Sequence, residues 1–123
     1  MNPKTILLVE DDEFNAQLVV EYFCKTNVRL LKAQNGLEAI RLFKQNPEID
    51  ITLMDIQLPD INGFELTQMF KSLNSNCVVI AQTAYAAESD RKRALACGCV
   101  DYISKPIDQQ KLLKLIQNYL FKR

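Results

Sequence analysis

Apolar residues follow two different spacings along this chain. Short continuous runs, of which Ile6, Leu7, Leu8 and Val9 are the first, alternate with longer segments in which apolar positions lie three or four residues apart. A short continuous run is typical of a strand that is covered on both faces of a sheet. We therefore predict five strands, over residues 6–9, 28–33, 49–54, 77–81 and 102–104.

The longer segments have the spacing of amphipathic helices. Pro47 follows the second segment, and Gly98 follows the fourth, where a left-handed residue commonly ends a helix. Helices are therefore predicted over residues 14–25, 37–46, 64–73 and 88–97, with a fifth after Pro106 that continues to the C-terminus. On the first and last helices we expect these residues in the core: Phe14, Leu18, Tyr22, Leu112 and Ile116.

Strands that alternate with helices favour a parallel sheet with right-handed crossovers and helices on both faces. The expected fold class is α/β, a doubly wound five-stranded parallel sheet with five helices. A chain of 123 residues has the length of one domain, and neither a repeat nor a linker rich in proline, glycine or serine divides it. We expect a single domain over residues 1–123.

Composition narrows the class of partner. The chain is 48% hydrophobic and 24% charged, as in globular domains, and Lys plus Arg and Asp plus Glu both number 15. Because the net charge is zero, we expect no direct binding of nucleic acid, and the basic cluster at residues 91–93 is interpreted as a solvated face or a protein contact. No apolar run is long enough to span a bilayer, and residues 1–4 lack a signal-peptide layout. We therefore expect a cytoplasmic protein without membrane insertion.

The cysteines Cys24, Cys77, Cys97 and Cys99 are expected to be reduced thiols and mostly buried, because a chain of this size builds a core without disulfides. Cys97 and Cys99 could supply half of a metal site, but the chain has no histidine and no second close cysteine pair to complete four ligands. The lack of histidine also excludes catalysis by a histidine base.

Polar residues that could bind a ligand or take part in a reaction follow four of the five predicted strands. In a doubly wound sheet, ligands bind at the carboxyl ends of the strands, which meet at one edge. We therefore expect side chains that are distant in sequence to lie together there. The candidates are Glu10, Asp11 and Asp12 after the first strand, Asp55 after the third, Thr83 after the fourth and Lys105 after the fifth.

The residue types at this edge suit phosphoryl transfer. Carboxylates a few ångströms apart need a cation, and oxygen ligands of this kind suit Mg²⁺, which keeps positions open for a phosphoryl oxygen. Asp55 would then be the nucleophile that forms an aspartyl phosphate. Lys105 would balance the charge of the phosphoryl group, and the Thr83 hydroxyl would hydrogen-bond one of its oxygens.

Four segments resemble, in order and spacing, the motifs of response-regulator receiver domains of two-component and phosphorelay signalling. They lie at residues 8–12, 54–63, 83–84 and 101–106, and they read LVEDD, MDIQLPDING, TA and DYISKP. The resemblance covers essentially the whole chain and includes receivers of hybrid histidine kinases and single-domain response regulators. It implies the flavodoxin-like strand order 2-1-3-4-5 and a Mg²⁺ cofactor, with Mn²⁺ as the alternative ion.

By this resemblance Asp55 is the phosphoacceptor, and Glu10 and Asp11 are the acidic pair. Together with Asp55 and the backbone carbonyl of Gln57, the pair would hold the metal ion. In the family the pair follows the last apolar residue of the strand, so Asp12 falls one position beyond it and is interpreted as a helix cap. Because Glu10 has the longer side chain, it is expected to reach the metal ion through water, and Asp11 is the stronger candidate for a direct ligand.

The resemblance also assigns residues that would control the response. Thr83 and Tyr102 are similar to the family's conformational switch pair, and Gln57 and Tyr85 hold positions that tune the lifetime of the phosphoryl group. The peptide bond between Lys105 and Pro106 is expected to be cis, as is common in receivers.

The implied function is a phosphorylation-controlled switch. A histidine kinase or histidine phosphotransfer protein would donate a phosphoryl group to Asp55, and the surface of the fourth helix, fifth strand and fifth helix would change to control a downstream protein. Such a domain is not an enzyme with a separate substrate, although it catalyses its own phosphorylation and dephosphorylation, and it would be a monomer or weak dimer.

Two other classes of function remain. One is a constitutive interaction module that keeps the fold but is not phosphorylated. The other is an aspartyl-phosphate hydrolase of the haloacid dehalogenase type. That family places its nucleophile after the first strand in an Asp-x-Asp motif, where this chain has Glu10, Asp11 and Asp12.

Overall fold

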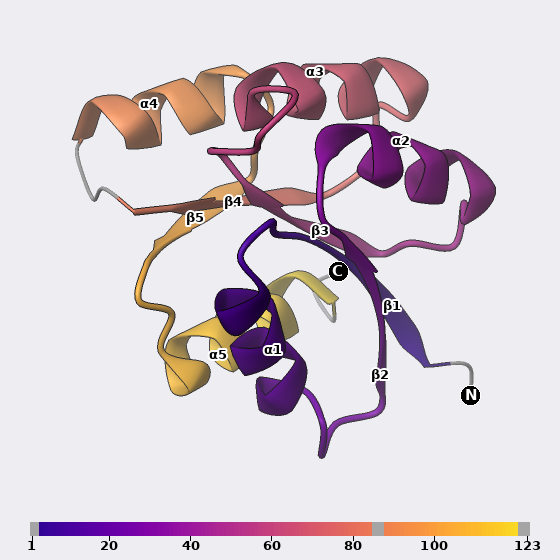
Figure 1. The fold of residues 1–123 in the computed structure, drawn as a ribbon, viewed down its shortest axis with the longest axis vertical. Coiled ribbons are helices and arrows are strands. Elements are labelled where there is room, and N and C mark those ends of the chain that lie inside the picture. Colours follow the sequence, from indigo (N-terminus) through magenta and orange to yellow (C-terminus); the bar gives the residue numbers. More distant parts are fainter. Residues whose placement is uncertain (1–2, 85–87, 121–123) are drawn as a thin grey trace.

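The computed structural model describes residues 3–84 and 88–120. Its strands are β1 (Lys4–Val9), β2 (Val28–Ala33), β3 (Ile51–Asp55), β4 (Val79–Thr83) and β5 (Asp101–Ser104). They form one parallel sheet in the order β2-β1-β3-β4-β5 (Figure 1). The predicted fold class and strand order are both confirmed.

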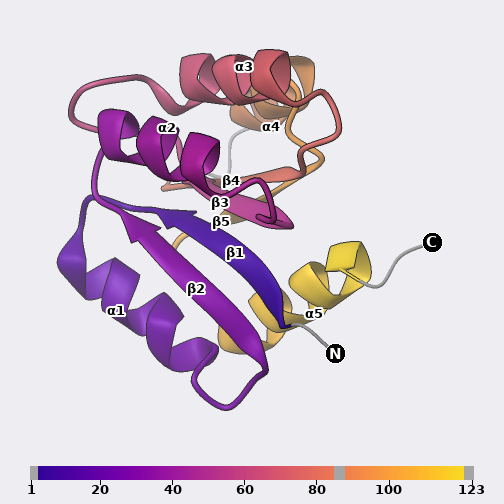
Figure 2. The same cartoon turned by 90° about the vertical axis from the view of Figure 1, so that its right-hand side faces the viewer.

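Five helices connect the strands and cover both faces of the sheet. They are α1 (Glu13–Tyr22), α2 (Gly36–Gln45), α3 (Gly63–Leu73), α4 (Glu88–Ala96) and α5 (Gln109–Leu120). Figures 1 and 2 show α1 and α5 on one face and α2, α3 and α4 on the other. The loops that follow the strands therefore gather at one edge of the sheet, as the doubly wound topology requires.

The sheet separates two apolar clusters, because successive side chains of a strand point to opposite faces. On β1, Ile6 and Leu8 belong to the cluster under α1 and α5, and Leu7 and Val9 belong to the cluster under α2, α3 and α4. All four are fully buried. The continuous apolar run that predicted β1 is thus explained by burial on both faces.

Helix ends are stabilised by side chains close in sequence. Asp12 caps α1 by accepting a 3.0 Å hydrogen bond from the backbone N–H of Asn15, which confirms its interpretation as a cap. Asn35 and Asn62 cap α2 and α3 in the same way. Beyond the end of α4, Gly98 has a φ of 114°, the left-handed conformation expected there.

One residue of the predicted apolar face of α1 is exposed to solvent. Ala16, Val19 and Phe23 are buried, whereas Phe14 is 77% exposed. Phe14 lies two residues before Ala16, which places it about 200° away around the helix. The prediction that Phe14 lies in the core is therefore wrong. Of the other predicted core residues, Leu112 and Ile116 are buried, and Leu18 and Tyr22 are half-buried.

Some boundaries also differ from prediction. The first helix ends at Tyr22 rather than at residue 25. The third strand is Ile51–Asp55 rather than residues 49–54, and the fourth is Val79–Thr83 rather than residues 77–81. The register explains the shift, because β4 pairs with β3 from Thr52↔Val79 to Asp55↔Gln82. Backbone pairing therefore carries β4 through two polar residues that the apolar pattern excluded.

Candidate functional site

Polar side chains from four strand ends meet at the edge of the sheet. Asp55 is the last residue of β3 and Thr83 the last of β4, whereas Glu10 and Lys105 directly follow β1 and β5. The strands are short and the loops leave from one edge, so the topology alone brings these four positions together.

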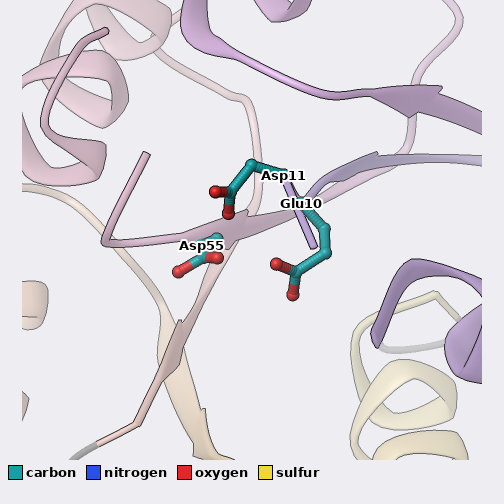
Figure 3. A group of neighbouring side chains, drawn as sticks. All are labelled: Glu10, Asp11 and Asp55. Atoms are coloured by element: carbon teal, nitrogen blue, oxygen red, sulfur yellow. The ribbon is translucent and has the colours of Figure 1, made fainter. Parts of the chain in front are cut away.

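Three carboxylates lie closest together at this edge. One oxygen each from Glu10, Asp11 and Asp55 lies within 4.8 Å of the others, and Figure 3 shows the three side chains converging. Glu10 and Asp55 are buried, with 2% and 4% of their surface exposed, whereas Asp11 is exposed. Asp12 instead caps α1. The donor set fits a hard divalent cation such as Mg²⁺, which prefers carboxylate oxygens and retains water on its open side.

Lys105 links the two buried carboxylates. Its Nζ lies 2.9 Å from Glu10 Oε1 and donates a 3.1 Å hydrogen bond to Asp55 Oδ2. Burial opposes the ammonium charge, but the two carboxylates outweigh it and raise the pKa of Lys105. Lys105 is therefore a cation held at the phosphoacceptor position predicted from the sequence.

The surroundings of Glu10 disfavour its ionised form. Burial is the largest cause, and together with the Asp55 carboxylate it raises the pKa of Glu10 to about 7, against the opposing effect of Lys105. One ammonium therefore does not fully compensate the buried acids. A further positive charge at this edge would favour the ionised form of Glu10.

The loop after β3 is fixed against Asp55. The backbone N–H of Gln57 donates a 3.0 Å hydrogen bond to Asp55 Oδ1, and the N–H of Gly63 donates a 2.9 Å hydrogen bond to the carbonyl of Ile56. A Cβ on Gly63 would lie 2.4 Å from the Asp55 carbonyl oxygen. Only glycine permits this approach of α3 to the strand end.

Asp60, in the same loop, was not among the predicted site residues. Its carboxylate accepts hydrogen bonds of 2.8 and 3.1 Å from the backbone N–H groups of Gly36 and Leu37, at the start of α2. It thus ties the loop after β3 to a neighbouring helix. The turn-rich sequence around Asp60 predicted a loop, but it carried no signal for the helix that Asp60 would contact.

Gln82 was also missed, although a polar residue directly after a predicted strand was visible in the sequence. It pairs in register with Asp55 on one side and Ile103 on the other. Its side chain is fully buried, and neither amide atom has a hydrogen-bond partner among the described residues. A buried amide in this state costs free energy.

The remaining predicted residues lie around the carboxylates or beyond them. Thr83 is buried, and its carbonyl accepts a 2.7 Å hydrogen bond from the N–H of Lys105. Tyr102 on β5 is half-buried against the cluster under α2, α3 and α4, with the guanidinium of Arg91 5.9 Å from its ring centre. The Lys105–Pro106 peptide bond is cis. Tyr85 lies outside the described residues.

The cysteines contribute nothing to this site. All four are free thiols, with Cys77 and Cys99 buried, Cys97 half-buried and Cys24 exposed, so the expectation of burial is wrong for Cys24. It follows α1 on the surface, where the chain turns toward β2. Within residues 3–84 and 88–120, no group of three potential metal ligands includes a cysteine. None of the described helices is long and apolar enough to cross a membrane.

Comparison with known proteins gives one consistent result. The family model described as "Response regulator receiver domain" matches residues 6–117. The polar-differentiation response regulator DivK of Brucella anthropi is 38% identical over 120 residues, which cover 96% of this chain and 97% of DivK.

Solved structures agree with the sequence comparison. A chain of the CheX–CheY–BeF3–Mg²⁺ complex from Borrelia burgdorferi superposes with a TM-score of 0.92 at 28% identity, covering 98% of this chain and 91% of that one. A chain from the complex of the Saccharomyces cerevisiae phosphotransfer protein Ypd1 with the receiver domain of Ssk1 has a TM-score of 0.87 at 29% identity, covering 97% and 90%.

Proposed function

The chain belongs to the response regulator receiver family, and from this premise we propose that it is a phosphoacceptor switch whose receiver domain spans residues 1–123 and which takes a phosphoryl group onto Asp55. One observation carries the proposal: Asp55 is a buried carboxylate held by the Lys105 ammonium beside two further acids. An ordinary surface aspartate would have neither the burial nor the cation.

The transfer follows from the groups around Asp55. A carboxylate oxygen of Asp55 attacks the phosphorus of a phosphohistidine, the P–O bond forms, and the P–N bond breaks with its electron pair left on the donor imidazole. Lys105 stays beside the new phosphoryl group and balances its charge. The Thr83 hydroxyl hydrogen-bonds a phosphoryl oxygen.

Glu10, Asp11, Asp55 and the carbonyl of Gln57 would hold the metal ion, Mg²⁺ or alternatively Mn²⁺. When bound, the ion supplies positive charge that offsets the carboxylates and the incoming phosphoryl oxygens. The close approach of the three acids and the raised pKa of Glu10 support this, since both call for more positive charge than Lys105 provides. Of the acidic pair, the exposed Asp11 would bind the ion directly, and Glu10 would reach it through water.

The switch and the lifetime of the phosphoryl group are assigned by family resemblance. The phosphoryl group draws Thr83 inward, Tyr102 fills the vacated space, and the surface of α4, β5 and α5 changes to control a downstream protein. NMR spectra with beryllofluoride in which residues 83 and 102 did not move would overturn this. Gln57 and Tyr85 tune hydrolysis, so substituting both without any change in phosphoryl lifetime would contradict their role.

The proposed donor is a histidine kinase or a histidine phosphotransfer protein, in a cytoplasmic setting and with this chain as a monomer or weak dimer. The receiver domain of Ssk1 crystallises with the phosphotransfer protein Ypd1, which supports a donor of this kind. Phe14 offers a contact for it, because this exposed aromatic side chain stands at the start of α1, beside the acidic edge.

The proposal is tested by incubation with acetyl phosphate or a labelled phosphohistidine donor, with and without Mg²⁺, followed by intact mass. We expect a Mg²⁺-dependent, acid-stable and base-labile gain of one phosphoryl group that is lost in Asp55→Asn. Asp12→Asn is the matched control, because Asp12 caps α1 outside the cluster and should leave the gain intact. A folded protein that gained nothing from any donor would instead be a constitutive interaction module. Sustained turnover of phosphomonoesters would identify a hydrolase.

A further inference from the structure

The turn between α4 and β5 brings two cysteine sulfurs together. Cys97 and Cys99 flank Gly98, whose φ of 114° reverses the chain at the end of the helix. The N–H of Cys99 then donates a 3.0 Å hydrogen bond back to the carbonyl of Ala94. As a result the two Sγ atoms lie 4.0 Å apart. In an extended segment, by contrast, the residues on either side of a glycine would be held farther apart.

The two thiols of this pair have different surroundings. Cys97 is half-buried at the surface, and its thiol donates to the carbonyl of Ala94 at 3.1 Å. Cys99 is 5% exposed and packs with the Thr67 hydroxyl, 3.8 Å away. Burial, with the Cys97 sulfur beside it, raises the pKa of Cys99 to about 12, so Cys99 remains a protonated thiol. An oxidant in solution therefore reaches the sulfur of Cys97 more easily than the buried sulfur of Cys99.

We propose that Cys97 and Cys99 are an oxidisable pair, in which Cys97 reacts with a peroxide and Cys99 resolves the product as a disulfide. The Cys97 thiolate attacks one peroxide oxygen, the O–O bond breaks, and Cys97 becomes a sulfenic acid while hydroxide leaves. The Cys99 sulfur then attacks the Cys97 sulfur, and the sulfenic oxygen leaves as water with the Cys99 proton. The two thiols lose two electrons, and the peroxide takes them up.

The disulfide would form where α4 joins β5. The sulfur atoms must close from 4.0 Å to about 2.05 Å. That movement takes the Cys97 thiol away from the carbonyl of Ala94, in the last turn of α4. Oxidation would therefore change how α4 ends at Ala96, and Cys99 lies two residues before β5 begins at Asp101.

Cys24 and Cys77 supply the matched comparison within the same chain. Cys24 is exposed, and Cys77 is buried two residues before β4. Neither is flanked by a second cysteine in the sequence. Removing both, as Cys24→Ser with Cys77→Ala, leaves the proposed pair as the only thiols of the chain.

The experiment treats this double variant with hydrogen peroxide, blocks free thiols with a maleimide under denaturing conditions, and measures intact mass. We expect a monomer that has lost two hydrogens and both maleimide additions, with both additions restored by dithiothreitol. Adding Cys99→Ser should stop the reaction at a Cys97 sulfenic acid that dimedone traps. Adding Cys97→Ser should leave Cys99 open to maleimide and unlabelled by dimedone.

The proposal is overturned if both thiols stay reactive toward maleimide after peroxide, or if the disulfide forms only between two chains. Circular dichroism of each variant before treatment establishes that the fold is retained. If a variant does not fold, the series is repeated with Cys77→Ser in place of Cys77→Ala. No phosphoryl donor is involved, and Asp55→Asn is expected to oxidise like the unsubstituted chain. If the cysteine pair does not oxidise as proposed, the proposed phosphoacceptor function is unaffected. If Asp55 is not phosphorylated, the proposal for the cysteine pair is likewise unaffected.

Discussion

Gly63 lies where α3 begins, against the end of the strand that carries the proposed phosphoacceptor Asp55, and Gly63→Ala tests whether that close approach organises the site. A Cβ at this position would lie 2.4 Å from the Asp55 carbonyl oxygen and 2.6 Å from Ile56 Cα. Both are backbone atoms that cannot rotate away. Contacts of a Cβ below 3.0 Å essentially do not occur, so helix and strand end must separate by about half an ångström.

The expected effect on stability is the balance of two opposing contributions. Alanine favours a helix over glycine by up to about 1 kcal/mol. Forcing a methyl group into a filled space costs about 1–3 kcal/mol. We therefore expect Gly63→Ala to lower the free energy of unfolding by about 1–2 kcal/mol. Because the displaced atoms belong to Asp55 and its neighbour, the rate of phosphorylation should fall by about tenfold or more.

Gly36→Ala is the matched control, since Gly36 is also the first residue of a helix with an asparagine cap. Its Cβ would meet the side chain of Ile61 at 3.0 Å rather than a backbone, and a side chain in a loop can shift. Urea unfolding and the initial rate with acetyl phosphate should therefore change less than in Gly63→Ala. If Gly63→Ala were as stable and as fast as the unsubstituted chain, the close approach would not require glycine and the reasoning would be refuted.

Three further predictions concern residues around the site. Gln82→Met, which keeps the volume and removes the unpartnered amide, should raise the free energy of unfolding by about 1–2 kcal/mol in urea, and a decrease would show that the amide has a partner. Phe14→Ser should slow phosphoryl transfer from a phosphohistidine protein by about tenfold and leave the rate with acetyl phosphate unchanged; equal slowing with both donors would contradict a docking role. Backbone N–H groups, first that of Gly36, lower the pKa of Asp60, so its ionised form stabilises the fold above pH about 4, and this contribution is lost as pH falls through the lowered pKa. In Asp60→Asn, the free energy of unfolding measured as a function of pH should lack this loss at acid pH. If the pH dependence were the same as in the unsubstituted chain, ionised Asp60 would not contribute to stability.

The order of elements and the strand-end positions could be predicted because both depend on local patterns. A run such as Ile6 to Val9 is apolar on both faces only if helices cover both faces, and that condition already specifies the doubly wound sheet. Once the sheet is parallel, the residues after each strand share an edge. Glu10, Asp55 and Lys105 could therefore be placed together although they are far apart in sequence.

The extent of the buried face of α1 could not be predicted in the same way. Phe14, Leu18, Val19, Tyr22 and Phe23 have the spacing of one apolar face. The structure buries Val19 and Phe23 and half-buries Leu18 and Tyr22, but it leaves Phe14, in the first turn, exposed. Hydrophobic spacing identifies a helix and its apolar side but does not show how far along the helix the contact with the sheet extends.

Contacts that depend on three-dimensional placement could not be predicted from local sequence patterns. Asp60 accepts from the start of α2, 24 residues away, and nothing local to either segment indicates the other. Gln82 is polar, so the apolar pattern predicted that the strand ends before it. In the structure Gln82 pairs with Asp55 on one side and with Ile103 on the other, and it therefore belongs to the sheet. Sheet pairing is shared between neighbouring strands, so one strand can be extended by partners whose own sequences are favourable. The residues that sequence patterns missed at this site are thus those placed by their neighbours and not by their own local pattern.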